Sequence, residues 1–170
     1  MKETSLLRIV VADANVLINF MHVSRLGLLA EIPNHRFVVP DHVRAEIKRT
    51  DQRAILDDAV LVGWLDIEVI HDIDTIAVFT ELIARMGRGE AACIAIAAQR
   101  GWFIASDEKR LFLREATSRV GAGRVLTTID LFVLAIKAGL ISVDDADREK
   151  AALERKRFTV KLGSFRELVG

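Results

Sequence analysis

The chain has 170 residues, enough for one domain with a sizeable core. Lys plus Arg and Asp plus Glu each total 24, so the formal net charge is zero and the chain as a whole is not a basic nucleic-acid binder. Any contact with a polyanion must therefore come from a local patch or a metal. The single cysteine, Cys93, excludes an internal disulfide and a cysteine-based zinc cluster. With no visible N-terminal targeting signal and no apolar run of membrane-spanning length, we expect a soluble, cytoplasmic protein without a membrane partner.

Short apolar, β-branched runs alternate with segments of helical period along the chain. We expect strands at about 8–12, 36–39, 66–70, 102–105 and 124–126. We expect helices in two pieces over 15–31 with a break near 22–24, then over about 41–49, 53–62, 74–85 and 87–101, from Asp107, from Thr127 and over 143–156. This alternation predicts an α/β fold with three α/β/α layers and a mostly parallel central sheet.

The composition changes after about residue 141. From there the chain becomes highly charged, as in "DDADREKAALERKRF". We expect residues 1–141 to form the main domain, and residues 142–170 to form a C-terminal charged helix and tail packed on that same domain.

Two predicted strands end on an aspartate. "RIVVAD" ends on Asp13 and "GWFIASD" ends on Asp107. In an open parallel sheet, ligands bind just beyond the carboxyl ends of the strands. If both strands are central and parallel, the two carboxylates emerge at one edge of the sheet.

Two glutamates lie on helices that border the predicted core. In "PDHVRAEIKR", Glu46 lies on the flank of the inward stripe marked by Val43 and Ile47. In "GEAACIAIAAQ", Glu90 is the only acidic residue of an otherwise apolar helix and lies in its first turn. Both carboxylates therefore border buried surface.

Each of the four acids also has a purely structural explanation. Asp13 and Asp107 could cap the helices that follow them, Glu90 could complement a helix dipole, and Glu46 could pair with a neighbouring arginine. Four separate caps, however, need not converge on one edge. Clustered carboxylates repel one another, and hard divalent cations such as Mg²⁺ or Mn²⁺ compensate them because these ions prefer oxygen ligands.

Two further polar residues stand close to the strand ends. Asn15 could orient a carboxylate or serve as a turn or cap residue. Thr127 and Asp130 have the spacing of a capping box, and we favour this structural interpretation of Thr127 over a catalytic one. A hydroxyl at this edge could still contact a phosphate.

Three segments together resemble the PIN domain, a metal-dependent ribonuclease fold whose most numerous members are the VapC-like toxins of prokaryotic toxin–antitoxin pairs. The segments are "VADANVLI", "VVPDHVRAEI" and "GRGEAACIAIAAQRGWFIASDEKRLF", and the similarity spans about residues 8–140. The family often has Asp where this chain has Glu90.

The resemblance implies an endoribonuclease that requires Mg²⁺ or Mn²⁺ and hydrolyses phosphodiester bonds of RNA. Its acidic site would fall on Asp13, Glu46, Glu90 and Asp107, with Asp13, Glu90 and Asp107 as metal ligands and Asn15 as the small polar residue after the first acid. It also implies a toxin that pairs with a small antitoxin protein and forms a homodimer.

Three alternatives remain open at this point. A phosphatase of the haloacid-dehalogenase type also begins with an aspartate after the first strand, but it has a second Asp where this chain has Asn15. A receiver-like module has paired acids after the first strand and a lysine after a late one, and neither is evident here. The third alternative is a PIN-like domain that binds nucleic acid or protein without catalysis.

Overall fold

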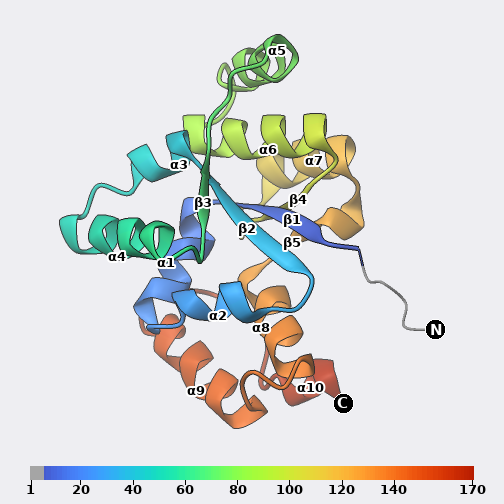
Figure 1. The fold of residues 1–170 in the computed structure, drawn as a ribbon. Coiled ribbons are helices and arrows are strands. Elements are labelled where there is room, and N and C mark those ends of the chain that lie inside the picture. Colours follow the sequence, from blue (N-terminus) through green and yellow to red (C-terminus); the bar gives the residue numbers. More distant parts are fainter. Residues whose placement is uncertain (1–5) are drawn as a thin grey trace.

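The computed structural model describes residues 6–170. Its centre is a five-stranded, all-parallel sheet in the order β3-β2-β1-β4-β5 (Figure 1). The strands are β1 (Arg8–Ala12), β2 (His35–Pro40), β3 (Asp66–Glu68), β4 (Phe103–Ala105) and β5 (Val125–Leu126). The α/β/α fold class and the position of every strand predicted from the sequence are confirmed. Residues 1–5, which the expectation about a targeting signal concerns, lie outside the described residues.

Strand β1 lies at the centre of the sheet because it pairs with β2 on one side and β4 on the other. Val10, Val11 and Ala12 are fully buried, as a strand covered on both faces requires. Ala12 is in register with Ala105 of β4, so these two strands end at the same level.

Helices cover both faces of the sheet, and Figure 1 shows the layers. One face carries α6 (Arg88–Arg100) and α7 (Arg110–Val120), with α5 (Ile73–Leu82) packed outside α6. The other face carries α1 (Ala14–His22), α2 (Leu26–Glu31) and α8 (Thr128–Lys137), with α9 (Val143–Glu154) and α10 (Arg166–Val169) beyond them. Helices α3 (Asp41–Glu46) and α4 (Thr50–Leu61) follow β2, and the 3-10 turn η1 (Ala122–Arg124) precedes β5. Within residues 6–170, no helix has the length and apolar content needed to cross a bilayer.

Helix α6 is sandwiched between the sheet and neighbouring helices, which explains why its sequence is apolar nearly all round. Its residues 91–97 are buried without exception, and small side chains allow close packing on several sides. Gly101 ends the helix with a left-handed φ of 67°, a conformation that glycine adopts without steric cost. The long apolar helix thus aims its N-terminus at the edge where β1 and β4 end.

The C-terminal segment packs on α8. Phe165 is fully buried, and its ring lies 5.6 Å from that of Phe132. Asp147 of α9 fixes the segment, because its carboxylate accepts hydrogen bonds from the Ser164 hydroxyl (2.6 Å) and the Phe165 amide (2.8 Å). The chain between α9 and Phe165 is therefore anchored at both ends.

Two helix starts differ from the sequence-based expectation. Helix α5 begins at Ile73, one residue before the expected start, and Asp72 caps it, because the Asp72 carboxylate accepts the Thr75 amide at 3.0 Å. Helix α7 begins at Arg110 rather than at Asp107, since the carboxylate of Asp107 bonds to the start of α8 instead. Helix α3 ends at Glu46, three residues earlier than expected, where the chain turns to bury Ile47.

Candidate active site

The order of the strands in the sheet changes direction between β1 and β4. From β1 the chain continues to β2 and β3 on one side, and it returns to β4 and β5 on the other. Such a switch in strand order is where open α/β sheets bind ligands. The residues that follow these two strands, Asp13 after β1 and Ser106 to Glu108 after β4, lie at this switch point.

Asp13 is the most buried acid of the site, with 3% of its surface exposed. Its Oδ1 accepts the Ala14 amide at 2.8 Å, which caps α1, and its Oδ2 accepts the Ser106 hydroxyl at 2.9 Å. The pKa of Asp13 is nevertheless raised to about 6, chiefly by burial and to a smaller extent by the nearby charges of Glu108 and Glu46. Asp13 is therefore a helix cap and also a member of an acidic cluster.

Glu46 reaches from the end of α3 to the N-terminus of α6. Its Oε1 accepts the Gly89 amide at 2.8 Å and satisfies one of the unpaired N–H groups of the first helical turn. A Cβ at position 89 would lie only 2.3 Å from Oε2 of Glu46, so this approach requires glycine. Gly89 in the sequence "GRGE" thus allows the Glu46 carboxylate to bind at the N-terminus of α6, beside Glu90.

Glu90 is half-buried in the first turn of α6. Burial raises its pKa to about 7, and the charges of Glu108, Asp13 and Glu46 act in the same direction. The carboxylates of Glu90 and Glu46 are neighbours, because a Cβ at Gly87 would lie 3.6 Å from Oε1 of Glu90 and 3.8 Å from Oε1 of Glu46. The structure therefore brings Asp13, Glu46 and Glu90 to one place, as the sequence suggested.

Glu108 is the fourth member of this carboxylate cluster, and the sequence analysis did not single it out. Its charge acts on both Asp13 and Glu90, and its Oε1 accepts a hydrogen bond from Nδ2 of Asn15 at 3.2 Å. The sequence did contain a signal for Glu108. In "SDE" two acids follow one another after a strand, and in an extended chain successive side chains point to opposite sides.

Asp107 lies at the same edge but points toward α8. Its Oδ1 accepts the Thr128 amide (2.8 Å), and its Oδ2 accepts the Thr128 hydroxyl (2.5 Å) and Nδ2 of Asn19 (3.0 Å). The pKa of Asp107 is raised, chiefly by burial, although these hydrogen bonds act to lower it, and the charge of Asp130 adds to the increase. The structure therefore does not bring Asp107 together with the other three predicted acids.

The two auxiliary residues have clear structural contacts. Oδ1 of Asn15 accepts the Asp107 amide at 3.2 Å, so Asn15 connects the ends of β1 and β4 while it holds Glu108. Thr127 caps α8, and the capping box with Asp130 is present in full. The structural interpretation of Thr127 is confirmed, and it is Thr128 that contacts Asp107.

In the part of the chain that the structure describes, the cluster of Asp13, Glu46, Glu90 and Glu108 has no cationic partner. Among residues 6–170, none of these four carboxylates lies within 4 Å of a lysine, arginine or histidine nitrogen. Two other glutamates, Glu81 and Glu115, are instead paired with arginines.

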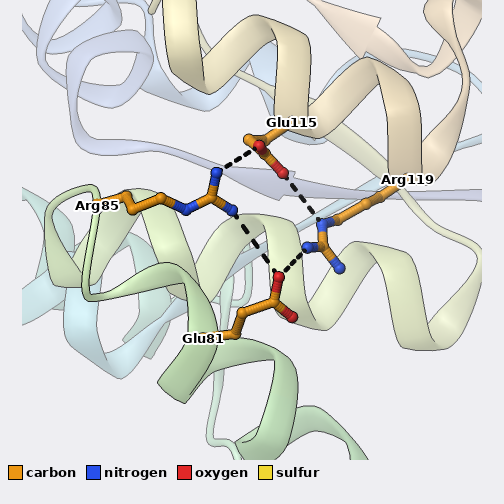
Figure 2. Close-up of polar contacts among 4 residues, drawn as sticks. All are labelled: Glu81, Arg85, Glu115 and Arg119. Carbon is orange, nitrogen blue, oxygen red and sulfur yellow. Dashed lines mark hydrogen bonds and ion pairs between the residues drawn. The ribbon is translucent and has the colours of Figure 1, made fainter.

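In Figure 2, Glu81 and Glu115 alternate with Arg85 and Arg119 in a closed ring of contacts between α5, the turn after it, and α7. Arg85 holds the pKa of Glu115 below its usual range, the opposite of what happens to Glu90. By contrast, no described residue forms an ion pair with the site acids.

The chemistry of the cluster fits a divalent cation. All of its donors are carboxylate oxygens, the ligands that Mg²⁺ and Mn²⁺ prefer, and a cation would remove the repulsion that raises the pKa values of Asp13 and Glu90. Within residues 6–170, no group of three or more Asp, Glu, His or Cys side chains is placed so that it could hold a metal ion as it stands. Glu46 and Glu108 have exposed side chains, so closing around an ion needs side-chain rotation rather than a change of fold.

Fold and site together define an all-parallel α/β domain with an unneutralised acidic cluster at its switch point. A family model described as a PIN domain matches residues 9–168, nearly the whole chain, and no curated protein matches the sequence. The chain belongs to the PIN-domain family. PIN domains are generally nucleases and typically use divalent metals. The match extends through α9 and the C-terminal segment.

Proposed function

We propose that this protein is a divalent-metal-dependent endoribonuclease. The observation that carries the proposal is the cluster of four carboxylates without a cationic partner at the switch point of a PIN fold. Membership of the PIN-domain family favours this function over the phosphatase and receiver alternatives. The choice of RNA rests on the family resemblance, because fold alone does not define a substrate.

The roles within the cluster follow from burial and contacts. Asp13, fixed by Ser106 and Ala14, is the most rigid carboxylate and forms the base of a metal site. Glu90 and Glu108 complete the ligand set, with Asn15 orienting Glu108. The family resemblance implied Asp107 as a ligand, but the contacts favour Glu108 because the Asp107 oxygens are occupied by Thr128 and Asn19.

When bound, Mg²⁺ or Mn²⁺ supplies Lewis-acid chemistry, which activates water for attack and offsets charge that develops on the scissile phosphate. The protein's own contribution is to hold and orient. Glu46 is exposed and fixed by the Gly89 amide, so it can accept a proton from the attacking water. The N-terminus of α6, aimed at the same place, adds a fixed partial positive charge.

We further propose the toxin role of a toxin–antitoxin pair, with a small antitoxin as partner and a homodimer as the assembly. This role rests on the resemblance to VapC-like toxins. Expression of the chain alone should arrest growth, and co-expression of an adjacent small gene should restore it. Normal growth under strong expression of an active enzyme would contradict the toxin role and would leave the nuclease intact.

The nuclease is tested by incubating the purified full chain with end-labelled single-stranded and structured RNAs. Cleavage should require Mg²⁺ or Mn²⁺, stop in excess EDTA and leave 5′-phosphate and 3′-hydroxyl ends. Glu90→Gln should reduce the rate by about 10²-fold or more, a typical loss for a group that acts on the transition state. Glu115→Gln, which removes a carboxylate already paired with Arg85, is the matched control and should cleave as wild type. Cleavage that persists in EDTA would refute the metal mechanism.

A further inference from the structure

A cavity of about 500 Å³ lies next to the carboxylate cluster, and we call it the tail pocket. It is enclosed by the loop after β4, the start of α8 and the C-terminal segment 157–168. Its volume falls within the range of pockets that hold small ligands. Its walls are apolar and its rim is cationic: Ile129, Phe158, Val160, Leu162 and Leu168 form the walls, and Lys109, Arg157 and Lys161 provide the charges.

The loop after β4 separates the tail pocket from the carboxylate cluster. Asp107 and Lys109 line the pocket, whereas Ser106 and Glu108 face the cluster, where they contact Asp13 and Asn15. This alternation is that of an extended chain, whose successive side chains point to opposite sides. A polymer bound across this loop would therefore contact both the tail pocket and the carboxylate cluster.

The three cations at the rim are available to an anionic ligand. Among the described residues, Lys109, Arg157 and Lys161 take part in no ion pair. The one carboxylate in the lining, Asp107, has both oxygens engaged by Thr128 and Asn19. The pocket thus combines positive charge with apolar surface, and the neighbouring cluster is strongly negative.

Arg157 adopts a backbone conformation that normally selects glycine. It follows α9 with a φ of 67°, its amide donates to Glu154 O, and the Phe158 amide donates to Leu153 O. These two bonds define a Schellman motif, in which the left-handed position is usually Gly. Arginine at this position adopts a strained backbone conformation that glycine would adopt without strain. The retention of a long cationic side chain here points to a function for that side chain.

We propose that the tail pocket binds the nucleotide adjacent to the scissile phosphate of a single-stranded RNA. The base packs against the apolar walls, including Phe158, and the flanking phosphate contacts Arg157 and Lys161. This inference rests on the proposed nuclease function for its substrate class. An acidic polypeptide would match the charges of the rim, but RNA also accounts for the position of the pocket one loop away from the cluster.

The test measures binding of a fluorescent single-stranded RNA by anisotropy in EDTA, which prevents cleavage, over a series of salt concentrations. Arg157→Gly should weaken binding by about tenfold, as expected for loss of one hydrogen bond to a charged group. It should also lower the salt slope by about 0.7, the value for one phosphate contact on a single strand. Its melting temperature should stay equal or rise, because glycine suits the left-handed position. Lys161→Ala should lower affinity and slope in the same way.

Lys156→Ala is the matched control, since Lys156 is an exposed neighbour of Arg157 outside the pocket lining, and its binding should equal that of wild type. Equal weakening in all three variants would indicate a diffuse charge effect and overturn the subsite. Unchanged RNA binding in Arg157→Gly and Lys161→Ala would also overturn the subsite and would favour a polypeptide ligand. Wild type that binds no RNA would also overturn it.

The two proposals fail separately. Site-dependent RNA binding without cleavage in any metal would keep the subsite and refute the nuclease. Metal-dependent cleavage with pocket variants that bind like wild type would keep the nuclease and refute the subsite.

Discussion

Asn15 holds Glu108 at the edge of the sheet, with 3.2 Å between Nδ2 and Oε1. The same side chain accepts the backbone amide of Asp107 through its Oδ1, so one residue after β1 contacts both acids after β4. The side chain of Glu108 lies with the carboxylate cluster, whereas Thr128 and Asn19 hold the carboxylate of Asp107 at the start of α8. The two consecutive acids are predicted to differ in function.

Substitution of each acid separates these roles. Glu108→Gln should reduce metal-dependent RNA cleavage strongly while stability in EDTA holds or rises, because a source of repulsion is removed. Asp107→Ala should lower the free energy of unfolding by about 1–2 kcal/mol, since it removes the acceptor of hydrogen bonds from Thr128 and Asn19. Urea denaturation in EDTA and a cleavage assay check both. If Asp107→Ala keeps full stability and loses cleavage while Glu108→Gln remains active, the assignment is reversed.

The sequence contained most of the fold and part of the site. Buried β-branched runs located every strand, and the ends of β1 and β4 located the switch point together with Asp13. Glu46 and Glu90 could be predicted from their positions on helices that border the core. The different positions of the Asp107 and Glu108 side chains could not be predicted from the sequence. They depend on Asn19 and Thr128, which lie 88 and 21 residues away from Asp107 along the chain. The tail pocket depends in the same way on a chain return that no local pattern encodes.

Gly89→Ala tests whether cleavage requires the Glu46 carboxylate to stay at the N-terminus of α6. A methyl group would meet the Glu46 carboxylate at 2.3 Å, so this flexible side chain must leave the N-terminus of α6. Cleavage should fall severalfold or more. The melting temperature should change little, because alanine is favoured over glycine in a helix by about 1 kcal/mol and offsets the lost hydrogen bond. Gly123→Ala, at a position with open space, is the control for both measurements. Wild-type cleavage by Gly89→Ala would show that the position of Glu46 has no role.

The raised pKa values predict an unusual pH dependence for the metal-free protein. The pKa of Asp13 is about 6 in the folded state against 3.8 ordinarily, so folding favours the protonated acid. Stability contributed by this group is therefore present at low pH and is lost as the pH rises from about 4 to above 6, by about 3 kcal/mol. Glu90, with a pKa of about 7 against 4.5, acts in the same direction with a smaller effect because it is more exposed.

Urea denaturation in EDTA at pH 5 and pH 7.5 measures this loss. Wild type should lose more stability between the two values than Asp13→Asn, in which the buried group does not ionise. The difference between the two proteins isolates Asp13 from other titrating groups. An identical pH dependence in both would mean that Asp13 is ionised at no cost in the folded state.

If the carboxylates of the cluster bind a divalent cation, Mn²⁺ should raise the melting temperature of the protein, and a thermal melt with and without Mn²⁺ measures this change. Asn caps a helix about as well as Asp, so Asp13→Asn retains the cap of α1 and removes only the charge. Wild type and Glu115→Gln should gain melting temperature from Mn²⁺ by mass action, more at pH 7.5 than at pH 5 because protons compete for the same oxygens. Asp13→Asn and Glu90→Gln should gain much less. An equal shift by Mn²⁺ in wild type and in both cluster variants would contradict the account.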